Sequence, residues 1–235
     1  MPPKANNNAL AQRKKEQLKQ KQKTRRLIWF TTVGVILALI IVAVLIQPKS
    51  KAAEFDYANL PVLGNPEAPV KIVEFGDFKC PACKQVNELI KPQLLKDYID
   101  QGKVAFYFVN LPFISPDSYT AALAVQSVYH QNEKVYWNYF DEVYKNQGDE
   151  KTEWATADFL VDLAKKTNLD LDYDKLNQDI VDKTYKSEVD AQYALGDKLK
   201  VDSTPTFFIN GIQYPADLGD YSALKKYIDH ELEGK

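Results

Sequence analysis

The pattern of apolar and polar residues separates a short N-terminal part of the chain from a long patterned part. Residues 1–26 are polar and basic, and the run Leu27–Ile46 (LIWFTTVGVILALIIVAVLI) then holds no charged residue over 20 positions. At about 1.5 Å per residue, a helix of this length spans roughly 30 Å, the thickness of the hydrocarbon core of a bilayer. The pattern therefore predicts a transmembrane helix, followed by a polar linker over residues 47–59.

Two nearly continuous apolar runs, Val70–Phe75 and Val104–Val109, predict buried strands in the part that follows. Turn-forming residues interrupt the chain after the first run, and Pro81 stands where the first turn of a helix is expected. This helix is predicted to extend to about Asp100 and to end at Gly102, because glycine favours the backbone conformation that stops a helix. The three elements form a strand-helix-strand unit.

The middle of the chain, from Asp117 to about Lys200, has no convincing strand. Its apolar residues recur at helical spacing, which predicts several amphipathic helices. Examples are Tyr136, Tyr139, Phe140, Val143 and Tyr144, and later Phe159, Leu160, Leu163 and Ala164. We therefore expect a helical insertion over residues 115–200.

Strand character returns at Thr206–Ile209. The dipeptide Asn210-Gly211 follows, and it is the strongest short signal for a hairpin, so a partner strand is predicted at Ile212–Tyr214. A last helix is predicted from one apolar stripe that can pack on a sheet. The stripe consists of Tyr221, Leu224, Ile228 and Leu232.

The predicted order is strand-helix-strand, helical insertion, strand-strand-helix. This order indicates an α/β fold in which the early strands need a crossover and the last two strands form an antiparallel hairpin. Residues 60–114 and 201–235 are expected to form the α/β core, and residues 115–200 the inserted helical domain.

The flanks of the apolar run predict how the chain is oriented. Nine Lys and Arg residues precede Leu27, against the single acid Glu16, so the positive-inside rule holds residues 1–26 in the cytoplasm. The rest of the chain is then extracytoplasmic, on a single-pass signal anchor in the cell membrane. The alternative is a cleaved signal peptide, but the apolar run is longer than usual, and the sequence after it, Ser50-Lys51-Ala52, is a poor cleavage site.

Charge excludes one class of partner for the outer part. Residues 52–235 carry 19 Lys and no Arg against 31 acidic residues, a net charge of −12. Nucleic acid is therefore not expected as a partner, because binding to phosphate needs a positive surface. The basic tail is interpreted as a topology signal, with contact to anionic lipid or nucleic acid as the alternative.

Both cysteines of the chain lie in one Cys-Pro-Ala-Cys motif, Cys80 to Cys83. A disulfide that closes a two-residue loop reduces the entropy of the unfolded chain only slightly, so it stabilises the fold little. The pair is therefore better suited to a reaction than to structural stabilisation. If the helix begins at Pro81, the thiol of Cys80 lies at its N-terminus, where unpaired N–H groups and the helix dipole stabilise a thiolate. Cys83 lies one turn further into the helix and is expected to resolve mixed disulfides.

Two alternatives to redox chemistry are an inert disulfide and a half-site for zinc. Zinc normally takes four ligands, and His130 and His230 are the only histidines of the chain. Neither stands near the cysteines in sequence, so no metal site is expected. The position of the motif between a buried strand and a helix favours redox chemistry.

The segments Val62–Lys84 (VLGNPEAPVKIVEFGDFKCPACK) and Ser203–Tyr214 (STPTFFINGIQY) resemble the DsbA family of thioredoxin-fold oxidoreductases, in particular its membrane-anchored BdbD-like members. The resemblance extends from about Leu60 to the C-terminus and implies a thioredoxin-like core with an inserted helical domain. It also implies an enzyme that donates its Cys80–Cys83 disulfide to newly exported, unfolded proteins. No bound cofactor is implied, and reoxidation is assigned to a quinone-linked membrane protein of the DsbB/BdbC type.

The resemblance implies roles for three further residues. Thr204 and Pro205 stand where the family has its cis-proline, which faces the cysteines and leaves a backbone edge for an extended substrate peptide. Glu74 matches a family acid that lies beneath the active site. If Glu74 is buried, its pKa rises and it can exchange protons with Cys83, whereas the alternative is an acid at a solvated strand edge.

Three further observations concern the residue before Cys83, the lysines that flank the motif, and one acidic stretch. Ala82 stands where the strongest oxidants of the family carry histidine, so the oxidising power is inferred from the resemblance alone. Lys79 and Lys84 flank the motif and are interpreted as solvated. The acidic stretch Asp170–Asp174 is interpreted as the solvated start of a helix.

The main hypothesis is a thiol oxidase whose reaction runs through Cys80. A reductase or isomerase with the same cysteines is the nearest alternative, because the direction of exchange depends on potential and partner. The other alternative is a non-catalytic, chaperone-like domain that holds unfolded chains near Thr204 and the loop Leu111–Ile114.

Overall fold

The computed structural model describes residues 7–45 and 51–234, in two separate units that divide at Ser50. The described part of the first unit is one helix, α1 (Asn7–Leu45). Among the described residues, no helix has both the length and the apolarity needed to cross a bilayer. The predicted anchor, residues 27–46, is thus not supported by these residues, and part of it lies outside them: residue 46 and the side chains of residues 27 and 40–45 are not described.

The second unit is built on a five-stranded sheet with the order β1-β3-β2-β4-β5. β2 and β3 pair in parallel, and the other neighbours pair antiparallel. The strands are β1 (Val62–Leu63), β2 (Val70–Gly76), β3 (Val104–Asn110), β4 (Thr206–Ile209) and β5 (Ile212–Gln213). The predicted strands and the hairpin are confirmed, whereas β1 was not predicted, since two residues are too few to show a pattern.

The helical segment after β2 begins at Pro81, as predicted, and continues to Ile99. It consists of α2 (Pro81–Gln85), η2 (Val86–Ile90), α3 (Lys91–Leu94) and η3 (Leu95–Ile99), where η2 and η3 are π-helical turns. Pro92 interrupts the hydrogen bonding of a regular α-helix because it has no N–H to donate to the preceding turn. We refer to residues 81–99 as the active-site helix.

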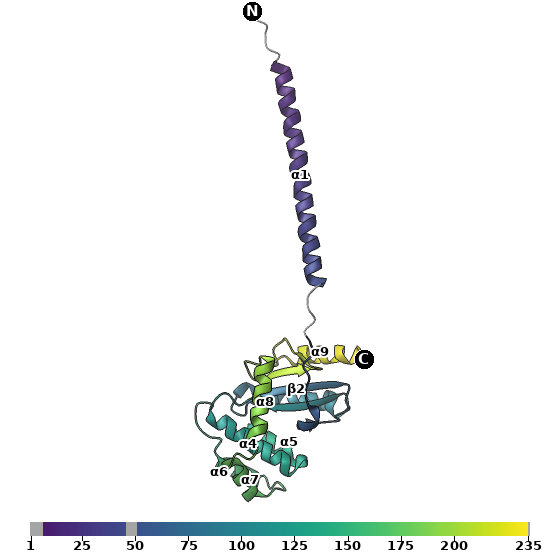
Figure 1. Ribbon diagram of the computed structural model, residues 1–235. Helices are drawn as coiled ribbons and strands as arrows, with labels where there is room; N and C mark the ends of the chain where they lie inside the picture. The colour runs from purple at the N-terminus through teal and green to yellow at the C-terminus, as the bar shows by residue number, and fades with distance from the viewer. Residues whose placement is uncertain (1–6, 46–50, 235) are drawn as a thin grey trace, which may run out of the picture. The chain divides into compact units, whose positions relative to one another are not determined.

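Five helices connect β3 to β4, so the predicted helical insertion is present between these strands, and Figure 1 shows most of it beyond one end of the sheet. They are α4 (Pro116–Gln131), α5 (Glu133–Lys145), α6 (Ala157–Lys166), α7 (Tyr173–Val181) and α8 (Lys186–Leu199). Asp172 caps the N-terminus of α7 through the N–H of Lys175, which fits the interpretation of the stretch 170–174 as the start of a helix.

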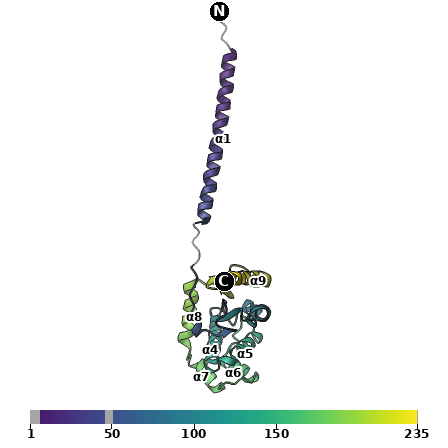
Figure 2. The same cartoon turned by 90° about the vertical axis from the view of Figure 1, so that its right-hand side faces the viewer.

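Helices cover both faces of the sheet (Figure 2). The active-site helix and α9 (Tyr221–Glu233) pack on the face that carries Val70 and Ile72. α8 packs on the face that carries Val73 and Phe75. The parallel strands β2 and β3 are thus buried on two sides, which explains their continuous apolar sequence.

The segment 53–59 differs from the polar tether that its composition predicted. The N–H of Ala53 donates to the carbonyl of Gly211 at 2.8 Å, and the ring of Phe55 packs on Phe208 with 5.6 Å between ring centroids. Tyr57, the first residue of the single turn η1 (Tyr57–Asn59), packs on Tyr107 with 4.7 Å between ring centroids. The two aromatic side chains bury apolar area on the sheet, an effect that average polarity does not reveal. Residues 47–50 of the predicted linker lie outside the described residues.

Candidate active site

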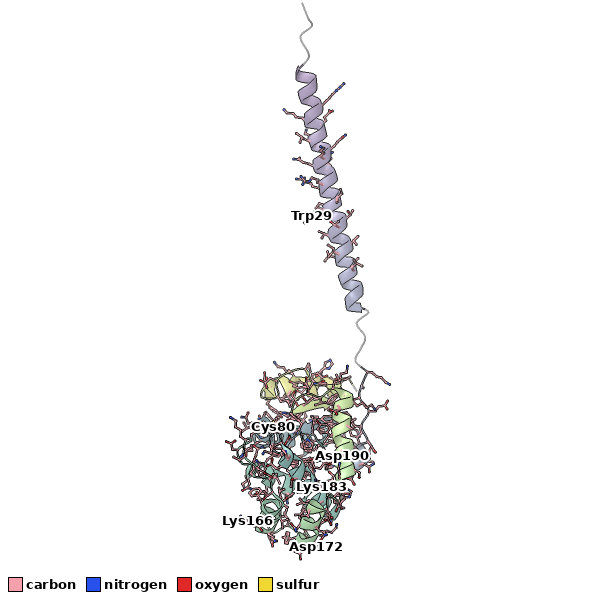
Figure 3. All side chains as sticks on the ribbon, turned by 60° about the vertical axis from the view of Figure 1, so that its left-hand side comes forward. Trp29, Cys80, Lys166, Asp172, Lys183 and Asp190 are labelled. Atoms are coloured by element: carbon pink, nitrogen blue, oxygen red, sulfur yellow. The ribbon has the colours of Figure 1, made fainter. Side chains whose placement is uncertain are left out.

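The two cysteines lie at the N-terminus of the active-site helix, on the unit shown with Cys80 labelled in Figure 3. Cys80 is the N-cap residue, with an extended backbone, and Pro81 is the first residue of the helix. Proline suits this position because its missing N–H has no partner in the first turn of a helix. Cys80 is 7% exposed and Cys83 is 0% exposed, and both are free thiols. An incoming reactant therefore reaches Cys80 first.

Thr204 and Pro205 lie directly opposite Cys80, in the loop before β4. The peptide bond between them is cis, as the resemblance implies, and the thiol of Cys80 donates to the carbonyl oxygen of Thr204 at 3.3 Å. The hydroxyl of Thr204 is buried and has no hydrogen-bond partner within the described part of the chain. This hydroxyl is therefore available to donate to Cys80 when its sulfur carries a negative charge.

The environment lowers the pKa of Cys80 to about 6. The largest cause is a hydrogen bond from the thiol of Cys83, which outweighs the opposing effect of burial. Smaller contributions come from Thr204 and from the backbone N–H groups of Ala82 and Cys83 at the start of the helix. The thiolate is thus stabilised without a histidine at position 82, and at neutral pH Cys80 is mostly ionised.

Cys83 has the opposite character. Burial raises its pKa well above the ordinary thiol range, and the hydrogen bond that it gives to Cys80 and the charge of Glu74 act in the same direction. Cys83 is therefore a protonated thiol at neutral pH, and it needs a proton acceptor before it can act as a nucleophile.

Glu74 lies in the interior of the sheet, below the cysteines. It belongs to the central strand β2, where it pairs with Phe108 of β3 on one side and with Phe207 of β4 on the other. Its side chain is buried, so the alternative of a solvated strand edge is wrong. Burial raises the pKa of Glu74 to about 8, with a smaller opposing effect from Lys91 and a small further rise from Cys80.

Lys79 is not solvated, in contrast to the sequence interpretation. Its side chain is 1% exposed, and its ammonium group donates to a carboxylate oxygen of Asp117 and to the carbonyl of Thr152, both at 2.7 Å. The local sequence gives no signal for this contact because Asp117 lies 38 residues away, at the start of α4. Lys84 is partly exposed, with its ammonium group 3.8 Å from Glu88.

Two further polar residues, not singled out from the sequence, fix the backbone around Cys80. The carboxylate of Asp77 accepts hydrogen bonds from the N–H groups of Lys79, Phe113 and Ile114 at 2.8–3.1 Å. The side-chain amide of Gln147 donates to the carbonyls of Phe78 and Cys80 at 2.7 and 3.0 Å. The loop that carries Cys80 is therefore held by the loop after β3 and by Gln147, just after α5.

A hollow of about 890 Å³ opens beside the cysteines, between the active-site helix and the chain around β5. Ala82 and Pro205 line it next to the reactive thiol, and Leu89, Tyr214 and Leu218 line it further away. Leu89 is largely exposed, so an apolar side chain faces solvent at this wall. This shape can accept an extended peptide that passes Cys80 and Thr204.

The described residues, 7–45 and 51–234, contain no group of three or more His, Cys, Asp and Glu side chains arranged to hold a metal ion. His130 instead forms a 2.7 Å contact with Glu188 and stacks on Tyr185.

The two thiols should differ sharply in their reactivity with iodoacetamide. In the reduced protein we expect the alkylation rate of Cys80 to rise with pH about a midpoint near 6, because the reactive thiolate forms there. Cys83 should stay unmodified between pH 5 and 8. Quenched time courses read by peptide mass spectrometry measure both rates. A midpoint near the ordinary thiol value of about 8.5 would contradict the stabilised thiolate.

Comparisons with known proteins agree with this geometry. The sequence model of the thioredoxin family (Thioredoxin_4) matches residues 58–230. The probable disulfide bond formation protein D of Bacillus cereus is 36% identical over 209 residues, which are 88% of this chain and 95% of that protein. The disulfide bond formation protein D of Bacillus subtilis is 38% identical over 175 residues, 74% of this chain and 78% of that protein.

A solved structure shows the same likeness in three dimensions. The crystal structure of oxidised BdbD from Bacillus subtilis matches with a TM-score of 0.74 and 35% sequence identity, over 79% of this chain and all of that chain. The crystal structure of DsbA from Chlamydia trachomatis matches with a TM-score of 0.65 at 23% identity, which supports the fold.

Proposed function

Because this chain belongs to the DsbA-like thioredoxin family and is a thiol-disulfide oxidoreductase that acts in disulfide formation, we propose that it oxidises exported proteins by donating a Cys80–Cys83 disulfide. The observation that carries the proposal is the contrast between the two thiols. Cys80 is the more exposed of the two, at 7%, and is stabilised as a thiolate, whereas Cys83 is fully buried and protonated. A good leaving group at the accessible position favours release of the oxidised substrate.

The proposed reaction has two exchange steps. A substrate thiolate attacks the sulfur of Cys80, the bond between Cys80 and Cys83 breaks, and Cys83 leaves with the electron pair. A second substrate thiolate then attacks the substrate sulfur of the mixed disulfide, and Cys80 leaves as a thiolate. The substrate gains a disulfide and loses two electrons, and the enzyme retains them as its two reduced cysteines.

Glu74 is proposed to move the proton that Cys83 requires. When Cys83 leaves as a thiolate, the protonated Glu74 carboxyl supplies a proton to its sulfur. When the enzyme is reoxidised, the ionised Glu74 takes that proton back, and the thiolate of Cys83 closes the disulfide on Cys80. A pKa of about 8 suits both directions near neutral pH, because neither form of Glu74 is rare.

The substrate is proposed to be an unfolded polypeptide in extended conformation. The cis bond at Thr204–Pro205 lies beside the thiol of Cys80, so an extended chain that pairs with the backbone at Thr204 brings its own cysteine to the reactive sulfur. Side chains of the substrate then face the hollow next to Ala82 and Pro205.

The proposed location is extracytoplasmic, with the apolar run Leu27–Ile46 as a single-pass anchor and the N-terminus in the cytoplasm. The support is the uncharged run with nine basic residues before it. Residues 60–114 and 201–235 are proposed as the thioredoxin-like core and residues 115–200 as the inserted domain, with a quinone-linked membrane protein as the reoxidation partner. Release of the full-length chain from membranes by carbonate washing would contradict the anchor.

The equilibrium of the full-length chain with glutathione buffers tests the direction of transfer. A stabilised Cys80 thiolate favours the reduced form, so we expect a reduction potential well above the thioredoxin value of about −270 mV. Alkylation of Cys80 after acid quenching measures the reduced fraction at each buffer ratio. A potential at or below the thioredoxin value would instead support the alternative of a reductase or isomerase.

A further inference from the structure

A buried lysine, Lys91, lies on the inner face of the active-site helix. The residue is 3% exposed, and its ammonium group lies 4.9 Å from the ring centroid of Phe140 and 5.5 Å from that of Trp137. It is hydrogen-bonded to the carboxylate of Asp141 on α5, which is 50% exposed. Because Lys and Glu are rarely buried without a partner, a lysine enclosed by aromatic rings and bonded to a half-exposed acid requires an explanation.

Lys91 belongs to a polar row on this helix. Cys83, Asn87 and Lys91 follow one another at intervals of four residues, so their side chains lie on one face of the helix. All three are buried, in a segment whose neighbouring inward side chains are apolar. The row begins at the thiol of Cys83 and ends at Lys91, which is bonded to the half-exposed Asp141.

Asn87 lies in the middle of this row with an unsatisfied polar atom. It is 8% exposed, and its side-chain oxygen has no hydrogen-bond partner among the described residues. Buried side-chain oxygens are generally bonded to protein or to ordered water. A water molecule beside Asn87 would satisfy this oxygen.

Glu74 interacts electrostatically with both ends of the row. The charge of Lys91 lowers the proton affinity of Glu74, and the charge of Glu74 raises that of Cys83. The other titratable groups that face Glu74 are Cys80, the N-cap of the active-site helix, and the hydroxyls of Tyr136 and Tyr144 on α5. Both tyrosines stay protonated because burial raises their pKa, so among these neighbours Lys91 is the one positive charge.

We propose that Lys91 is a positioning residue for Glu74, and that Lys91 and Asn87 form the path by which Glu74 exchanges protons with solvent at Asp141. This inference rests on the proposed shuttle between Glu74 and Cys83. Once Glu74 has given its proton to Cys83, it takes up another proton from solvent near neutral pH, because its pKa is about 8, and it must lose that proton before Cys83 can close the disulfide. The path carries this proton in and out, with no net change at Lys91 or Asn87.

The closing of the disulfide tests the path. Oxidised glutathione added to the reduced full-length chain first forms a mixed disulfide at Cys80 and then the disulfide between Cys80 and Cys83, and acid-quenched samples separate the two species by mass. Closing needs the ionised form of Glu74, so its rate in the unmodified chain should rise with pH about a midpoint near 8.

Lys91→Met should raise the pKa of Glu74 and move this midpoint upward by about one pH unit, which slows closing at pH 7 about tenfold, and because it also removes a member of the path it should slow closing several-fold at high pH as well. Lys91→Arg should restore the midpoint because it keeps the positive charge. Lys96→Met is the matched control, since Lys96 is exposed on the same helix. Asn87→Leu should slow closing several-fold at every pH without moving the midpoint.

The outcomes separate this inference from the proposed function. If no mixed disulfide forms in the unmodified chain, the proposed function is wrong. If it forms and closes with the same pH profile in Lys91→Met and Lys96→Met, the role of Lys91 is overturned. Should Lys91→Met fail to fold in a thermal melt, Asn87→Leu and Asp141→Asn decide the matter, and unchanged closing rates in both would overturn the path.

Discussion

Replacing Cys80 by serine is expected to abolish disulfide transfer, by roughly three orders of magnitude or more, because a hydroxyl can neither form the mixed disulfide nor leave as a stable anion. Cys83→Ser is the informative partner variant. It keeps the reactive sulfur at position 80 but removes the thiol that resolves mixed disulfides, so complexes with substrate should accumulate. Oxidation of a reduced, unfolded model protein, followed by non-reducing electrophoresis, measures both effects.

The same pair of variants tests the non-catalytic alternative. A chaperone-like domain would protect unfolded chains from aggregation equally well with serine at position 80. Transfer that persists in Cys80→Ser would contradict the proposed enzyme. Full protection without any transfer in the unmodified chain would favour the binding domain instead.

Asp117→Ala is expected to lower the free energy of unfolding by about 3–5 kcal/mol, since it leaves the ammonium group of Lys79 buried without its acid. Both side chains of this pair are at most 3% exposed, so solvent does not screen the lost interaction. Lys145→Met is a suitable control, because Lys145 is 69% exposed in its pair with Glu142 and should change stability by less than about 1 kcal/mol. Urea unfolding followed by circular dichroism measures the differences.

A double replacement, Lys79→Met with Asp117→Leu, should recover most of the lost stability because no buried charge remains. Although burial opposes it, hydrogen bonds from Lys79 and Ser115 lower the pKa of Asp117 below its ordinary value. The stability that this acid contributes is present above its unfolded pKa and is lost as the pH falls through the lower folded value. An Asp117→Ala variant as stable as the Lys145→Met control would contradict the account of a buried pair.

The sequence was sufficient to predict the elements that carry strong periodic signals. Continuous apolar runs located β2 and β3, the Asn210-Gly211 turn located the last hairpin, and Pro81 located the start of the active-site helix. Each of these signals is local, because it depends on a few consecutive residues and the backbone conformations that they allow.

The features that the sequence did not reveal depend on contacts between distant segments. Lys79 appeared solvated because its acid comes from the start of α4, and the buried position of Lys91 depends on rings and a carboxylate of α5. Glu74 is an intermediate case. Its neighbours in sequence indicated an unusual acid, but only the pairing of β2 with strands on both sides excluded an exposed edge.

Hydrogen bonds from the helical insertion to residues 78–80 determine whether the Cys-Pro-Ala-Cys motif can work in another protein. Gln147 holds the carbonyls of Phe78 and Cys80, and Lys79 is anchored on Thr152 and Asp117. All three partners come from the insertion, so the conformation of the Cys-Pro-Ala-Cys motif depends on contacts that the motif itself does not encode. A minimal thioredoxin scaffold that received only this tetrapeptide would contain both cysteines but would lack the hydrogen bonds that orient them. A redesign that transfers this site therefore has to transfer residues 77–83 together with the helical insertion.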